Sequence, residues 1–100
     1  MFRKSPDLTL ETAEGIAAQG LAFLAEEPAR LARFLTETGL EPERIRAQAA
    51  TPAFLAAVLE HLVGDESLLL VFAASTAVAP DTVAPALALL QQAVRGNARS

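Results

Sequence analysis

His61 is the only histidine in a chain that contains no cysteine, so acid–base or metal chemistry would have to be built around this one imidazole. Asp65 follows four residues later, and this spacing places two side chains on the same face of a helix. A metal site needs three or four protein ligands, and neither a second imidazole nor a thiolate is present to complete one. The sequence therefore predicts that His61 is an ordinary residue near a helix end, with no metal and no cofactor.

Nucleophilic catalysis and phosphate binding also lack their usual patterns. Ser67, Ser75 and Thr76 carry hydroxyls, but no Gly-x-Ser-x-Gly turn holds any of them, and the five glycines are scattered singly. The adjacent acids at 26–27 and 65–66 could do acid–base work. They stand where helices are expected to end or begin, where acids serve as caps and first-turn residues. We therefore predict no catalytic residue and a chain that is not an enzyme.

Four arginines are the only basic residues between positions 5 and 94, a segment whose twelve acids give it a net charge of −8: Arg30, Arg33, Arg44 and Arg46. They could form a patch that binds an anion or an acidic partner. Local ion pairing is the favoured interpretation, because Glu26–Arg30 and Arg33–Glu37 are both spaced for helical pairs. A further hypothesis is that Arg33 or Arg46 is partly buried and ties its helix to the next.

Nucleic-acid binding is disfavoured by the same charge distribution. An acidic body repels the phosphate backbone. A recognition helix needs exposed basic or amide side chains at its start, but the expected helices at 52–63 and 82–95 offer only small or apolar residues there. The arginine cluster leaves such binding open only as a lesser alternative.

Proline, glycine and capping residues divide the chain into short helical segments. Thr9, Thr51 and Asp65 are expected N-caps, and prolines open several segments. The pattern predicts helices over 10–26, 28–38, 42–49, 52–63, 66–78 and 82–95, with Gly96 ending the last one. We expect a flexible N-terminus over 1–8, a single helical domain over 9–96 and a disordered tail over 97–100.

The segment Leu68–Ala79 is apolar apart from Ser75 and Thr76. It is far shorter than the roughly 20 residues of a membrane-spanning helix, so we expect no membrane association. A helix that is apolar on every face belongs in the middle of a domain. The sequence therefore predicts an all-α fold, a compact bundle of five to six short helices around a central apolar helix at about 66–78. With no cysteine and no secretory signal, we expect a cytoplasmic protein.

Several short elements occur in an order that resembles a known family. They are Arg33-Phe34-Leu35, Thr38-Gly39-Leu40, Ile45-Arg46, Phe54-Leu55, Val58-Leu59, Asp65-Glu66, Leu68-Leu69 and Phe72. Together they are similar to a family of small alphaproteobacterial helical proteins known only as a domain of unknown function, over about residues 8–94. The resemblance implies an all-helical fold and supplies no activity, cofactor or catalytic residue. Leu10 stands where a proline is expected in that family, which affects only the start of the first helix.

The apolar content, 52% of the residues, exceeds what one small core obviously needs. Surplus apolar surface on a small domain often marks an interaction site. We therefore expect a non-enzymatic interaction or regulatory module, with an unidentified protein partner or a homodimer. Two patches are candidates, one with Phe23, Ala22 and Ala18 and one with Leu89 and Ala93. The alternative is a bundle that binds a small molecule or lipid between the helices at 10–26, 52–63 and 66–78.

Overall fold

Side-chain caps set the starts of three of the helices. The computed structural model describes the backbone of residues 8–99 and the side chains of residues 8–96. Helix α1, Leu10–Ala25, follows Thr9, whose hydroxyl accepts a hydrogen bond from the Thr12 amide at 3.1 Å. Thr51 caps α4, Pro52–Val63, and Asp65 caps α5, Glu66–Thr76, in the same way. All three predicted N-caps are confirmed, because each side chain satisfies an amide that the helix leaves unpaired.

Proline is the first residue of three further elements, one α-helix and two 3-10 turns. Helix α2 spans Pro28–Thr38, as predicted, and ends at Gly39 with a left-handed φ of 75°. The segment predicted as one helix over 42–49 is instead a 3-10 turn, η1 (Pro42–Arg44), followed by a single turn of helix, α3 (Ile45–Gln48). A second 3-10 turn, η2 (Pro80–Thr82), precedes α6 (Val83–Arg99). The described residues thus form six α-helices and no strand, which confirms the all-α class.

Two helix ends differ from the sequence prediction. Helix α5 stops at Thr76 because Ala77 adopts a left-handed conformation with φ 64°, which an alanine reaches only at a cost. Gly96 does not end α6, which continues to Arg99, because Gly96 stays within the helix and does not adopt the left-handed φ of a helix stop. The expected flexible N-terminus falls mainly on residues 1–7, which lie outside the described residues. Ser100, the last residue of the expected disordered tail, lies outside them as well.

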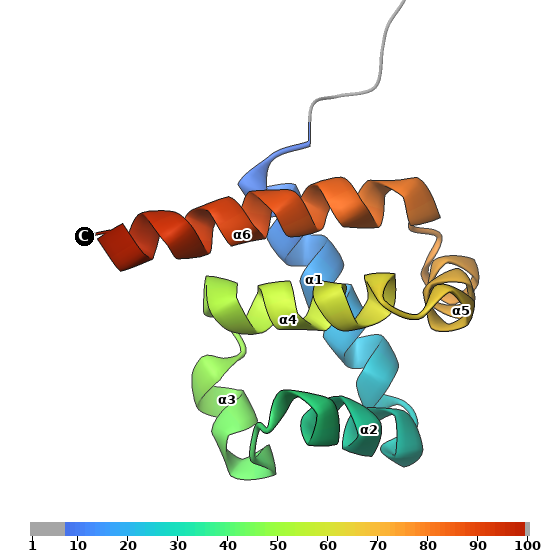
Figure 1. Cartoon of the computed structure of the whole chain (residues 1–100). Coiled ribbons are helices and arrows are strands. Elements are labelled where there is room, and N and C mark those ends of the chain that lie inside the picture. The colour runs from blue at the N-terminus through green and yellow to red at the C-terminus, as the bar shows by residue number, and fades with distance from the viewer. Residues whose placement is uncertain (1–7, 100) are drawn as a thin grey trace, which may run out of the picture.

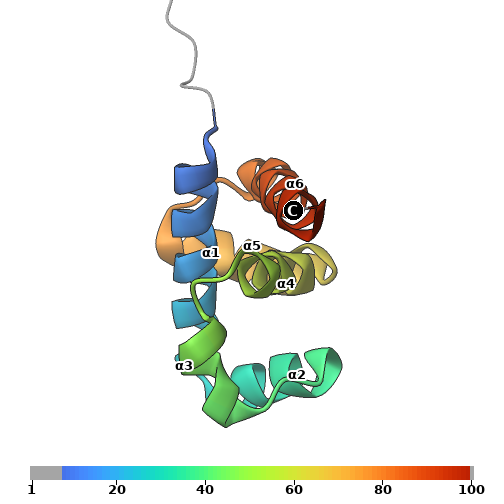
Figure 2. The same cartoon turned by 90° about the vertical axis from the view of Figure 1, so that its left-hand side faces the viewer.

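Helices α4 and α6 lie side by side with nearly aligned axes, and α1 crosses both of them (Figures 1 and 2). Helix α2 packs on the other side of α4 from α6, with α3 linking α2 back to α4. Helix α5 runs in a different direction from α4, so that Figure 1 shows α5 end-on and α4 from the side. Contacts with α1, α2, α5 and α6 all converge on α4.

The central helix is therefore α4, and the prediction that the helix at about 66–78 occupies the centre is wrong. Half of α4 is buried, at Phe54, Leu55, Ala56, Val58, Leu59 and Leu62, whereas Phe72 is the one buried residue of α5. A helix that is apolar all round carries no face preference of its own, so its neighbours decide which side is covered. The turn at Gly64 and Asp65 points α5 outward and leaves only its Phe72 side against the bundle.

The core between α1, α4 and α5 is closely packed. A Cβ atom placed on Gly20 of α1 would lie 3.0 Å from Val58 Cγ1 and 3.1 Å from Leu62 Cδ1, so any larger residue here would require these two side chains to shift. The rings of Phe23 and Phe72 meet edge to face at 5.4 Å. Among the described residues, no single helix is long and apolar enough to span a membrane. The segments Glu66–Thr76 and Pro80–Gly96 meet that criterion only as a pair bent by 112°.

Candidate functional site

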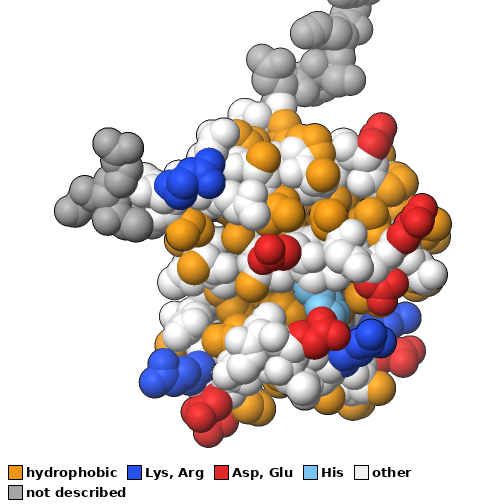
Figure 3. All heavy atoms as spheres, in the orientation of Figure 1, with side chains coloured by type: hydrophobic (Ala, Val, Ile, Leu, Met, Phe, Trp, Pro, Cys, Tyr) orange, Lys and Arg blue, Asp and Glu red, His pale blue; other side chains and the backbone are white. Residues whose placement is uncertain are grey.

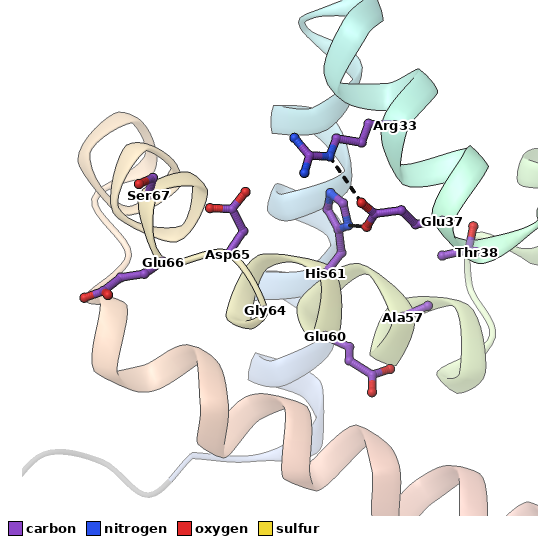
Figure 4. A pocket seen from close by; sticks show the side chains of 10 residues that line it. All are labelled: Arg33, Glu37, Thr38, Ala57, Glu60, His61, Gly64, Asp65, Glu66 and Ser67. Atoms are coloured by element: carbon purple, nitrogen blue, oxygen red, sulfur yellow. Dashed lines mark hydrogen bonds and ion pairs between the residues drawn. The ribbon is translucent and has the colours of Figure 1, made fainter.

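Glu37 joins α2 to α4 through two polar contacts. Its Oε1 lies 3.0 Å from Nδ1 of His61, and its Oε2 accepts a hydrogen bond from Nε of Arg33 at 3.2 Å. Figure 4 shows Glu37 placed between the other two side chains. Arg33 and Glu37 share a face of α2 because they are four residues apart, as the sequence predicted. The contact with His61 has no local signal, since 24 positions separate the two residues along the chain.

His61 belongs to the interface between α2 and α4. Its side chain is only 8% exposed, and its ring meets the Phe34 ring edge to face at 5.3 Å. Asp65, the neighbour considered from spacing, instead uses Oδ1 to accept the Leu68 amide and cap α5. The imidazole thus ties two helices together, which supports a structural role for this residue.

A carboxylate beside an imidazole is also the arrangement that orients a general base. When Nδ1–H donates to Glu37, the other ring nitrogen is left as an acceptor. A nucleophilic hydroxyl would have to lie next to that nitrogen. Ser67 is the nearest candidate along the chain, but Figure 4 places it on α5, on the far side of Asp65 from His61. Within residues 8–96, no hydrogen bond joins Ser67 to His61, so these residues do not form a catalytic set in this conformation.

An open groove of about 600 Å³ runs beside this contact, between α2, the end of α4 and the start of α5. Its lining includes four acidic residues, Glu37, Glu60, Asp65 and Glu66, and one arginine, Arg33. In Figure 3 red side chains lie beside the pale blue imidazole, and in Figure 4 the carboxylates of Glu60 and Glu66 point away from His61 and Glu37. We call this hollow the acidic groove.

The outer side of α5 is the second notable surface. Leu70 and Val71 are 50% and 46% exposed, the largest exposed fractions among the large apolar residues of the described part. Ser67 and Ala74 are exposed as well, and the four positions follow the i, i+3, i+4, i+7 pattern of one helix face. We call these four residues the α5 stripe. The sequence did not find it, because a segment that is apolar throughout gives no sign of which side faces solvent.

Arg30 fastens α2 to α1. Its guanidinium lies 4.2 Å from the centre of the Phe23 ring and donates a hydrogen bond of 3.5 Å to the Phe23 carbonyl, near the C-terminal end of α1. A cation is favoured both over an aromatic face and at a helix C-terminus. No ion pair joins Arg30 to Glu26 within residues 8–96, so that predicted pair is not formed.

The structure does not gather the four arginines into one patch. Arg30 and Arg33 are on α2, while Arg44 and Arg46 are exposed on η1 and α3, and Figure 3 shows blue side chains in separate places on this face. The hypothesis that Arg33 or Arg46 is partly buried is wrong. The side chain of Arg33 is 69% exposed, because its partner Glu37 is itself half exposed, and Arg46 is exposed as well. A role for these residues in binding an anion or partner stays a prediction.

The sequence also raised a metal site and an internal ligand cavity. Among the described residues, no three histidine, cysteine or acidic side chains come together in a way that could hold a metal ion. A ligand cavity between α1, α4 and α5 would need open space where Gly20 meets Val58 and where Phe23 meets Phe72. Those places are occupied by the side chains themselves.

Comparison with known proteins identifies a family. The model of a family described as "Protein of unknown function (DUF3572)" matches residues 10–93. No curated protein and no solved structure matches the chain.

Proposed function

The chain belongs to the DUF3572 family, whose function is unknown, and from this premise we propose that it is a non-enzymatic module that binds another protein through the α5 stripe. The observation that carries the proposal is the exposure of Leu70 and Val71, two adjacent large apolar residues left half open to solvent. Water-exposed apolar side chains gain roughly 25 cal/mol for each Å² that a partner covers.

The construction of α5 supports a docking role. Phe72 anchors the helix to the bundle through the Phe23 ring, and the opposite side carries the stripe. A short helix with one anchored face and one open apolar face can pack the open face against a helix of another protein. The buried imidazole of His61 contacts Glu37 and so helps to join α2 to α4.

The two patches expected from the sequence offer less. Phe23 is 2% exposed, so the predicted α1 patch retains only the small side chains of Ala22 and Ala18. Leu89 and Ala93 on α6 are partly covered. The stripe on α5 replaces them in the proposal, because it holds the two most exposed large apolar residues of the described part.

Photo-crosslinking in the native cell tests the proposal. A photoreactive residue at position 70 is expected to capture one discrete protein, while the same residue at exposed position 32 of α2 is expected to capture none. The captured protein is then purified and titrated with the full chain. The double variant Leu70→Ser/Val71→Ser is expected to weaken this binding by at least about tenfold, because two apolar anchors are lost.

Leu10→Ser serves as the matched control, because Leu10 is a similarly exposed leucine, 40%, at the start of α1. It is expected to leave affinity unchanged, and both variants are expected to keep wild-type helicity by circular dichroism. Binding that is indifferent to the double variant, or a stripe that captures nothing in the cell, would contradict the proposal.

A further inference from the structure

We infer that the partner presents a basic amphipathic helix, whose apolar side covers the α5 stripe and whose lysine or arginine side chains enter the acidic groove. The inference rests on the proposed function and adds the chemistry of the partner. Two surfaces that are continuous in the structure carry it, one apolar and one acidic.

The acidic groove and the α5 stripe meet at the first turn of α5. Glu66 and Ser67 line the acidic groove, and Ser67 is also the first residue of the stripe. From there the stripe continues through Leu70 and Val71 to Ala74, about two turns or roughly 10 Å along the helix axis. A segment lying on the stripe therefore passes directly over one end of the groove.

The charge of the groove is largely uncompensated. Arg33 and His61 both contact Glu37, so the cationic and imidazole groups are directed at one carboxylate. Within residues 8–96, no ion pair is formed by Glu60, Asp65 or Glu66. A cationic segment would supply the missing partners, and the chain's net charge of −4 would steer it toward the site.

Charge argues against other occupants of the same surface. A second copy would bring two acidic grooves together, so repulsion between like charges opposes a homodimer through this surface. Anionic lipid and nucleic acid would be repelled by the same carboxylates. A positively charged protein segment is the occupant that both surfaces fit.

Three synthetic peptides provide the probe. Each has about 18 residues, enough to hold a helix, and the same leucine face, and they differ only in a polar face of lysine, glutamine or glutamate. Binding to the full chain is measured by fluorescence anisotropy. We expect the lysine peptide to bind about tenfold more tightly than the glutamine peptide at low salt and the glutamate peptide to bind least. This preference should largely vanish at about 0.5 M salt.

Three double variants locate the effect. Glu60→Gln/Glu66→Gln is expected to remove most of the preference for lysine, whereas Glu11→Gln/Glu14→Gln, with the same change of charge on α1, is expected to keep it. Leu70→Ser/Val71→Ser is expected to weaken all three peptides. Equal binding of the lysine and glutamine peptides overturns the inference about charge, while the proposed docking role is then decided separately by the crosslink at position 70. A lysine preference that survives in the groove variant, or no binding by any peptide, also overturns the inference.

Discussion

Replacing Phe34 by alanine is expected to lower the free energy of unfolding by about 3–5 kcal/mol, the usual cost of deleting a buried phenylalanine ring. Phe34 is fully buried and is the one buried residue of α2. Its ring meets Phe54 edge to face at 5.9 Å and His61 at 5.3 Å, so its removal also withdraws the apolar wall that holds the imidazole. Because a domain of this size is stable by only about 5–15 kcal/mol, the loss should be large in a urea titration.

Thr36→Ala is the matched control, since Thr36 is an exposed residue of the same helix. It is expected to change stability by no more than about 0.5 kcal/mol. Hydrogen exchange should show the amides of α2 losing protection in the Phe34 variant before those of α4. A loss of stability below about 1 kcal/mol would show that α2 is not held by this ring.

Gly20→Val is expected to destabilise the chain by about 2–3 kcal/mol, because the added atoms must displace a packed neighbour. A Cβ at this position would already lie 3.0 Å from Val58 and 3.1 Å from Leu62, both in the central helix. Backbone shifts of α1 against α4 would then disturb the core at its most closely packed point. Thermal and chemical unfolding of the purified variant measure the effect.

Gly15→Val carries the same substitution to the exposed side of α1, where nothing lies within 4 Å of the added Cβ. It is expected to be neutral or slightly stabilising, by up to about 0.5 kcal/mol, because valine is a better helix former than glycine. The contrast between the two variants isolates close packing from helix propensity. Similar stabilities for both would mean that α1 and α4 do not approach as the structure shows.

Local signals predicted the elements well. Thr9, Thr51 and Asp65 each cap the helix expected of them, and Pro28 and Gly39 bound α2 as the sequence indicates. These features act within a few residues, so one sequence is enough to find them. Gly96 shows the limit of such rules, because glycine ends a helix only where the chain takes the left-handed conformation. Ala77, which these rules do not select, takes that conformation at the end of α5.

Contacts between segments that are far apart along the chain could not be predicted from the sequence. Helix α4 is central because four other helices contact it. The sequence of α5 is apolar throughout, so it contains no pattern that argues against a central position for that helix. The contact between Glu37 and His61, and the groove beside it, arise only when α2 folds onto α4. The same applies to Arg30, whose partner is the Phe23 ring of α1 and not a carboxylate one turn away.

Solvent access to the α5 stripe in the free chain is the quantity on which the proposed function depends most. It can be measured by NMR, as the broadening of methyl signals by a soluble paramagnetic probe in a dilute sample. The methyls of Leu70 and Val71 should broaden as strongly as those of exposed Leu10, while those of buried Leu59 and Leu62 should stay sharp. Leu70 and Val71 signals as protected as that of Leu59 would contradict an open stripe, and with it a docking role for α5.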